Sequence, residues 1–205
     1  MSFALTNWGY FIDGVLPNFI TAEEFNSYTA SKYAGDTRIA SNIKAVGTAI
    51  RNYCGWHVFS GLPCKFTSSF FDRRVADVRN GILIQLPAAF VTEITELTIG
   101  GQNCETYTLD PSGLVKVYNV PAHVESTPIV VLYTAGLSSD QMDVIKELTA
   151  QRVTHALASS YGVTSEAAGG VSITYNASWA RDTGSTNLTE VEKEILSPYR
   201  VGGVF

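Results

Sequence analysis

The stretch Ile129–Gly162, IVVLYTAGLSSDQMDVIKELTAQRVTHALASSYG, governs the interpretation of the whole chain. It opens with β-branched, apolar and aromatic residues, Ile129–Tyr133, which are typical of a strand, and Thr134-Ala135-Gly136 ends that run. Ser138 and Gln141 then have the spacing of a capping box. Residues three or four positions apart predict an amphipathic helix that stops at Gly162: Met142, Ile145, Thr149, Val153, Ala156 and Ser160.

Two further helices are expected upstream of this stretch. Thr21 and Glu24 have the spacing of a second capping box, which predicts a short helix over residues 21–33. The next helix is expected over residues 36–54, starting at Asp36 or Thr37. Its apolar residues recur at helical spacing and predict one buried face: Ile39, Ile43, Val46, Ile50 and Tyr53.

Between these helices the hydrophobic pattern changes to a period of two, over residues 64–134. Gly100-Gly101 and Asp110-Pro-Ser-Gly113 are turn signals. The stretch Val91–Ile99 alternates imperfectly, which predicts a β-bulge there. The expected strands are Lys65–Asp72, Ile82–Leu86, Val91–Ile99, Thr106–Leu109, Leu114–Tyr118 and Ile129–Tyr133.

These patterns predict an α+β protein: a helical bundle with an inserted small antiparallel β segment and an extended C-terminal arm. Three parts are expected: an aromatic N-terminal arm at 1–20, a main domain at 21–162, and a C-terminal docking arm at 163–205. The main domain holds helices at 21–33, 36–54 and 139–161 around the β insertion at 64–134. The N-terminal arm is expected either to fold onto the chain's own core or to contact another subunit.

The C-terminal arm combines a small, polar stretch, Val163–Gly170, with a short lone strand, Val171–Tyr175. Thr189 and Glu192 form a third capping box, which opens a short helix that ends before Ser197-Pro198. Because a lone strand needs a partner edge, it either pairs with its own sheet or adds to another chain. The predicted docking residues are Val171, Ile173, Tyr175, Trp179, Tyr199, Arg200, Val204 and Phe205.

Composition and charge argue against several classes of function. The net charge of −5 is opposite to the footprint of a nucleic-acid-binding protein. Cys54, Cys64 and Cys104 are scattered without CxxC spacing, so buried free thiols are expected rather than disulfides or a zinc site. No apolar run approaches the length of a membrane span, and the N-terminus lacks a signal-peptide pattern.

No constellation of catalytic residues is recognisable in the sequence. His57, His123 and His155 have no ligand or catalytic partner at a recognisable spacing, so structural roles are expected for them. The nucleophile elbow, the phosphate-binding loop and the dinucleotide fingerprint are all absent. We therefore predict no catalytic, cofactor-binding or metal-binding residue, and we do not expect an enzyme.

One basic cluster stands out in this acidic chain. Arg73, Arg74 and Arg79 lie in an expected loop between strands. Two interpretations remain open for this cluster. It is either a solvated loop or a contact for phosphate groups or an acidic partner face.

The serial order of these elements resembles a known family over roughly Thr21–Arg200. The most specific pieces are the strand end Val131-x-Tyr133-x-Ala-Gly136 and the closing Ile195-Leu-Ser-Pro-Tyr-Arg200. Leu86-Pro87 before Val91-Thr-Glu-Ile-Thr-Glu-Leu-Thr-Ile99 adds to the pattern, as does Gly170-Val-Ser-Ile-Thr-Tyr175. Together they resemble the head–tail connector, or head-to-tail adaptor, proteins of long-tailed bacteriophages.

The resemblance implies a non-enzymatic virion protein, assembled in the host cytoplasm, that forms a ring, usually dodecameric, below the portal at the capsid vertex. Implied partners are the portal protein, stopper or tail-completion proteins, and duplex DNA that passes through without specific binding. No membrane and no cofactor are implied. A ring has a heterologous interface, so each subunit needs two different sticky faces. The alternatives are another neck or tail-terminator protein, and a small hydrolase.

Overall fold

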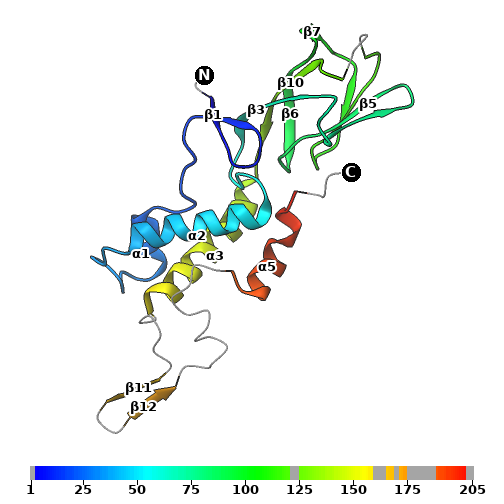
Figure 1. Cartoon of the computed structure of the whole chain (residues 1–205). Coiled ribbons are helices and arrows are strands. Elements are labelled where there is room, and N and C mark those ends of the chain that lie inside the picture. The colour runs from blue at the N-terminus through cyan, green and yellow to red at the C-terminus, as the bar shows by residue number, and fades with distance from the viewer. Residues whose placement is uncertain (1–2, 121–124, 159–164, 169–170, 175–187, 202–205) are drawn as a thin grey trace. The chain divides into compact units, whose positions relative to one another are not determined.

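The computed structural model describes residues 3–120, 125–158, 165–168, 171–174 and 188–201. The chain divides into two compact units (Figure 1). The first, here called the β unit, comprises Met1–Leu16, Cys54–Ser139 and Pro198–Phe205. The second, the helical unit, comprises Pro17–Tyr53 and Asp140–Ser197. Both units are therefore built from segments that are far apart in the sequence.

The larger sheet of the β unit has six antiparallel strands, in the order β1-β2-β3-β10-β6-β7. Strand β10 is central, and alternate residues along it, from Ile129 to Ala135, are buried. Gly136 follows this strand, and a side chain there would overlap the backbone of Ser60 and Gly61, so the position requires glycine. The strands are β1 Phe3–Leu5, β2 Phe11–Asp13, β3 Leu62–Ser69, β10 Pro128–Ala135, β6 Val91–Ile99 and β7 Gln102–Asn103.

Strand β6 contains the predicted irregularity, and it occurs twice. Its register against β10 shifts once beside Thr95 and once beside Thr92. Val91, Ile94 and Leu97 are three residues apart, yet all are buried on one face, because each bulge adds one residue between them. The corresponding sequence is Val-Thr-Glu-Ile-Thr-Glu-Leu. The two threonine hydroxyls donate hydrogen bonds to β10 carbonyls, Thr95 to Leu132 at 3.2 Å and Thr92 to Thr134 at 3.3 Å. The bulge prediction is confirmed.

A second antiparallel sheet of the β unit has four strands, in the order β4-β5-β9-β8. They are β4 Val75–Val78, β5 Gly81–Gln85, β9 Leu114–Val117 and β8 Tyr107–Leu109. Val75, Ile84 and Val115 lie opposite one another across the sheet and are buried. Both predicted turns are present, because Gly100 and Gly101 have positive φ angles and the Gly113 N–H donates to the Asp110 carbonyl at 2.9 Å.

The helical unit packs its helices around the predicted apolar faces. Ile43 and Ile50 of α2 are buried, as are Ile145 and Val153 of α3. The capping boxes at Thr21 and Thr189 are both formed, which confirms those predictions. The helices are α1 Ala22–Tyr28, α2 Ile39–Cys54, α3 Ser139–Ala158 and α5 Glu190–Leu196, followed by a 3₁₀ turn, η1, at Ser197–Tyr199.

The expectation of a helical bundle with a small inserted β segment is wrong. Residues 64–134 supply most of the strands of two antiparallel sheets that have an apolar core of their own, so the β part is not a small insertion. The larger sheet also takes strands β1 and β2 from the segment expected to be an N-terminal arm. In that segment Tyr10 and Ile12 are buried within the β unit.

The two upstream helices are shorter than expected, for local reasons. Helix α1 stops at Tyr28, because Ala30 and Ser31 have positive φ angles of 47° and 60°, which no helix accommodates. Helix α2 begins only at Ile39. Before it, the Asp36 carboxylate accepts hydrogen bonds from the Arg38 backbone at 2.8 Å and from its guanidinium, which closes a turn.

Candidate interaction surfaces

The C-terminal segment Pro198–Val201 is held against the β unit by an aromatic cluster. The Trp56 side chain is buried, and its Nε1–H donates a 2.6 Å hydrogen bond to the Tyr199 carbonyl. Phe90 lies between the two rings, with centroids 5.9 Å from Trp56 and 6.0 Å from Tyr199. The Val201 N–H donates to the Cys54 carbonyl at 3.0 Å. Two of the predicted docking residues are thus placed: Tyr199 is half-buried on its own chain, and Arg200 is exposed.

A buried polar network fixes the position of Trp56. The Tyr10 hydroxyl lies 2.8 Å from Nδ1 of His57 and accepts a hydrogen bond from the His57 backbone N–H at 2.9 Å. Nε2 of His57 lies 3.1 Å from the Ala135 carbonyl, and the His57 ring meets Trp56 edge-on at 4.8 Å. His57 is therefore a structural, hydrogen-bonded histidine that joins β10 to the segment after α2.

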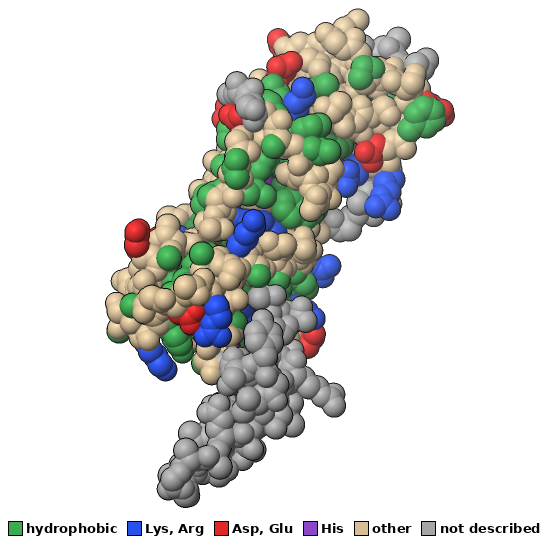
Figure 2. Space-filling view, turned by 60° about the vertical axis from the view of Figure 1, so that its left-hand side comes forward, with side chains coloured by type: hydrophobic (Ala, Val, Ile, Leu, Met, Phe, Trp, Pro, Cys, Tyr) green, Lys and Arg blue, Asp and Glu red, His purple; other side chains and the backbone are tan. Residues whose placement is uncertain are grey.

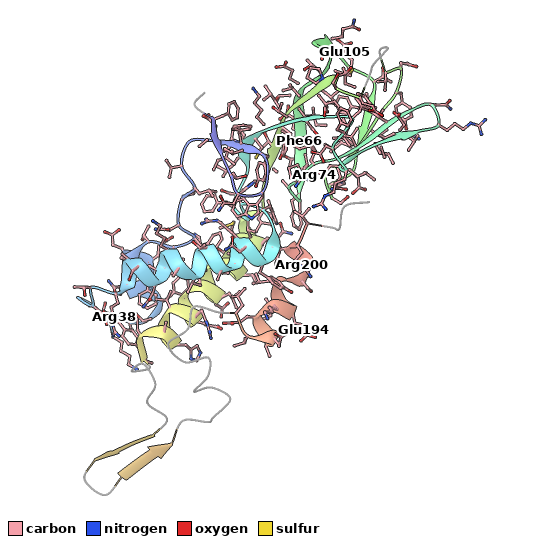
Figure 3. The ribbon with its side chains drawn as sticks, viewed as in Figure 1. Arg38, Phe66, Arg74, Glu105, Glu194 and Arg200 are labelled. Atoms are coloured by element: carbon pink, nitrogen blue, oxygen red, sulfur yellow. The ribbon has the colours of Figure 1, made fainter. Side chains whose placement is uncertain are left out.

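The arginine cluster is divided by strand β4: Arg73 and Arg74 lie on the β3–β4 turn, and Arg79 lies on the turn between β4 and β5. Asp72 organises the turn: its carboxylate accepts from the Arg74 backbone and from the Ser68 hydroxyl, both at 2.9 Å. The Arg74 guanidinium packs inward, 6.0 Å from the centre of the Phe66 ring and 3.4 Å from the Trp8 carbonyl (Figure 3). Arg74 is therefore occupied within its own unit.

The other two arginines point to solvent from opposite ends of β4. Arg73 precedes the strand and Arg79 follows it, and both are exposed. The structure does not bring the three arginines into one patch. Arg73 instead shares the β3–β4 turn with Phe71, whose side chain is 72% exposed. Sequence reasoning missed Phe71, because an aromatic residue beside a strand pattern reads as a core residue.

Helix α5 has an inner and an outer apolar face. Leu188, just before it, and Leu196 are buried, and the inward Glu192 carboxylate lies 3.9 Å from the Arg152 guanidinium. Val191 and Ile195 lie one turn apart on the other side and are 67% and 43% exposed. The sequence pattern did not separate these two faces, because apolar residues occur on both.

Two of the remaining predicted docking residues lie on a β-hairpin. Strand β11, Ser165–Ala168, pairs with β12, Val171–Thr174, and Glu166 lies opposite Ile173. The expected lone strand therefore has a partner within the small, polar stretch Val163–Gly170. Val171 and Ile173 lie on β12, whereas Tyr175, Trp179, Val204 and Phe205 lie outside the described residues.

The cysteine thiols and the potential metal ligands are the candidates for reactive or metal-binding groups. Burial raises the pKa of the Cys54 and Cys64 thiols to about 12, so both stay protonated at neutral pH. Among the described residues, no three His, Cys, Asp or Glu side chains are grouped as a metal ion requires.

An open groove of about 1010 Å³ runs beside α2, and Ala45, Thr48 and Ala49 contribute small side chains to it. Such a surface suits a protein partner better than a small substrate.

The surface is sparsely charged. On the face seen in Figure 2, apolar side chains reach the surface in several places, and charged side chains are scattered among them. Within the part of the chain that the structure describes, no helix has both the length and the apolar character needed to cross a membrane.

Comparison with known proteins decides the family. The family model described as "Head completion protein" matches residues 18–201, which is most of the chain. The chain belongs to the head completion protein family. No curated protein matches the sequence. The resemblance to phage head–tail connectors is thereby confirmed at the level of the family.

Membership of this family gives the protein its setting. It is a structural protein of a bacteriophage virion that acts in completion of the head, at or near the neck. Its partners are other head or tail proteins of the phage. A structural family of this kind favours a non-enzymatic role. In this setting, Phe71, Val191 and Ile195 are candidate contacts with neighbouring proteins.

Proposed function

We propose that the protein is a head-to-tail adaptor that forms a ring of identical copies below the portal. The ring continues the DNA channel and offers a docking surface to stopper or tail-completion proteins. The copies assemble in the host cytoplasm. The family match over residues 18–201 carries this proposal, because a head completion role at or near the neck is the setting in which an adaptor between head and tail would act.

The distribution of exposed apolar side chains supports a ring. A closed ring of identical copies has a heterologous interface, so two different patches of each copy must meet. Each unit has such side chains on its surface: Leu5, Val15 and Phe71 on the β unit, and Tyr28, Val144, Val191 and Ile195 on the helical unit. A single self-complementary patch would instead favour a two-fold dimer.

The net charge supports a channel that does not hold DNA tightly. Each phosphate neutralised by a basic side chain adds affinity, and a net charge of −5 limits such contacts. We expect only weak, salt-sensitive and sequence-independent binding of duplex DNA. The exposed Arg73 and Arg79 are the candidates for any phosphate contact.

The β11–β12 hairpin is the candidate docking element for the portal or for a neighbouring copy. A two-stranded hairpin is marginally stable by itself in water and gains stability when another strand or surface joins it. Among the strands that the structure describes, β11 and β12 pair only with each other, so their outer edges are the proposed sites of strand addition, a common mode of recognition. The residues proposed to act with it are Val171 and Ile173 on β12, Tyr175 and Trp179 after it in the sequence, and Tyr199, Arg200, Val204 and Phe205 toward the C-terminus.

A complementation experiment tests the proposed function. A phage that lacks this protein should accumulate DNA-filled heads and free tails that do not join, and adding the purified protein should restore joining. Electron micrographs of the restored heads should show added density below the portal. Normal joining without the protein, or recovery of the protein with free tails only, would overturn the adaptor proposal in favour of a tail-terminator role.

A further inference from the structure

We propose that the β3–β4 turn of one copy docks on the outward face of α5 in a second copy. The contact residues are Phe71 and Arg73 on the turn, and Val191, Glu194 and Ile195 on the helix. This inference rests on the proposed ring, and it names the two faces through which neighbouring copies meet.

The β3–β4 turn holds its exposed residues in a fixed position. The Asp72 N–H donates to the Ser69 carbonyl at 3.0 Å, and the Asp72 carbonyl accepts from the Val75 N–H at 2.8 Å. With the carboxylate bonds to Ser68 and Arg74, Asp72 closes the turn from both sides. Phe71 and Arg73 flank this residue and face solvent. Because the turn is already ordered, little conformational entropy is lost when a partner binds it.

Helix α5 offers a matching face. Its inner side is held by buried Leu196 and by the hydrogen bond from the Tyr53 hydroxyl to the Lys193 carbonyl at 2.9 Å. The outer side therefore presents Val191 and Ile195 from a fixed helix. The exposed Glu194 carboxylate adjoins Ile195 on this helix (Figure 3).

The two faces are complementary in both polarity and charge. The Phe71 ring and the Arg73 guanidinium together suit a partner surface that is both apolar and acidic. Aromatic and arginine side chains are also enriched in protein interfaces. A phosphate backbone would engage Arg73 but would leave Phe71 in water. The α5 face pairs aliphatic side chains with a carboxylate, so it meets both requirements. Because the two faces differ, copies add head to tail, as a ring requires.

Charge reversal in the full chain tests the contact. The measurement is the mass of the protein against concentration, by light scattering. Arg73→Glu and Glu194→Arg should each weaken self-association by about tenfold or more, and the two together should restore it. Phe71→Ala should weaken it by about tenfold. Arg79→Glu, with the same charge change at the other end of β4, should have no effect on self-association.

The outcomes separate this contact from the ring itself. If the unmodified protein assembles and the single reversals leave its assembly unchanged, the contact is wrong and the ring stands. Single reversals that weaken assembly without rescue in the double variant also overturn the contact. If Arg73→Glu changes only DNA affinity, Arg73 serves phosphate instead. If the unmodified protein stays monomeric both in solution and on heads, the ring fails and this contact fails with it.

A cross-linking measurement does not depend on the strength of assembly. Copies carrying Arg73→Cys, mixed with copies carrying Glu194→Cys, should form a disulfide-linked dimer when diamide is the oxidant. The natural thiols of Cys54, Cys64 and Cys104 are all buried, so they will not compete. Arg79→Cys in place of Arg73→Cys should give no cross-link. An equal yield from the two pairs would contradict the contact.

Discussion

The segment Pro198–Val201 and the β11–β12 hairpin both follow α3 in the chain, yet they are held in different ways. Trp56, Phe90 and the Cys54 carbonyl fasten the segment through a short hydrogen bond, ring contacts and a backbone bond. The hairpin forms a two-stranded sheet of its own. The fastened segment stabilises the β unit, whereas we propose that the hairpin binds a partner.

Removing the anchor of the fastened segment should have the largest effect. Trp56→Ala deletes a fully buried ring and the donor to the Tyr199 carbonyl, so it should lower the free energy of unfolding by about 3–5 kcal/mol. Denaturant unfolding measures this change. Trp56→Phe keeps a ring against Phe90 and should cost clearly less. A loss below about 1 kcal/mol in Trp56→Ala would show that the aromatic cluster is not a core.

The stability loss from a buried substitution in the helical unit is the reference against which the hairpin variant is compared. Ile43 lies fully inside the apolar face of α2, and Ile43→Ala should cost about 2–5 kcal/mol in denaturant unfolding. Ser41→Ala, at an exposed position of the same helix, is the matched control. A shift below about 0.5 kcal/mol for Ile43→Ala would mean that the buried face of α2 is assigned incorrectly.

The capping box of α5 should give an intermediate effect. The Glu192 N–H donates to the Thr189 hydroxyl at 3.3 Å, and the Thr189 N–H donates to the Glu192 carboxylate at 2.6 Å. Thr189→Ala should therefore lower stability by about 1 kcal/mol, whereas Thr189→Ser should retain most of it. Thermal unfolding by circular dichroism compares the two variants. Equal melting temperatures would indicate that α5 is fixed by its packing alone.

A break in the hairpin should have the smallest effect on stability and a large effect on attachment. Ile173→Pro removes a backbone donor from β12, and it should change the free energy of unfolding by less than about 0.5 kcal/mol. The same variant should fail to attach to portal-bearing heads. A stability loss near that of Ile43→Ala would place the hairpin in the core of the subunit. Normal attachment would show that the hairpin is not the docking element.

The sequence was a good guide wherever local signals decide the structure. The capping boxes at Thr21 and Thr189, the double bulge of β6 and the Gly100-Gly101 turn all follow from residues close together in the chain. Strand β4 was missed because three arginines surround its two valines and suggest a loop. Strand β11 was missed because its short stretch of small and polar residues resembles a linker.

The long-range contacts were beyond the reach of such signals. Tyr10 meets His57, and Tyr199 meets Trp56, across large separations in sequence that no periodicity encodes. The fold class was misjudged for the same reason: strands β1 and β2 join the larger sheet far from the stretch where the period of two is visible. Exposure of Phe71 and of the outer face of α5 likewise depends on the completed fold.

The most direct test of the account is a reconstruction, by electron cryomicroscopy, of the portal vertex of DNA-filled heads. The account predicts a closed ring of copies of this chain, coaxial with the portal and surrounding the DNA path. Within that ring, the β3–β4 turn of each copy should lie on α5 of the next. A vertex without this chain, or with isolated copies that make no contact with one another, would contradict it.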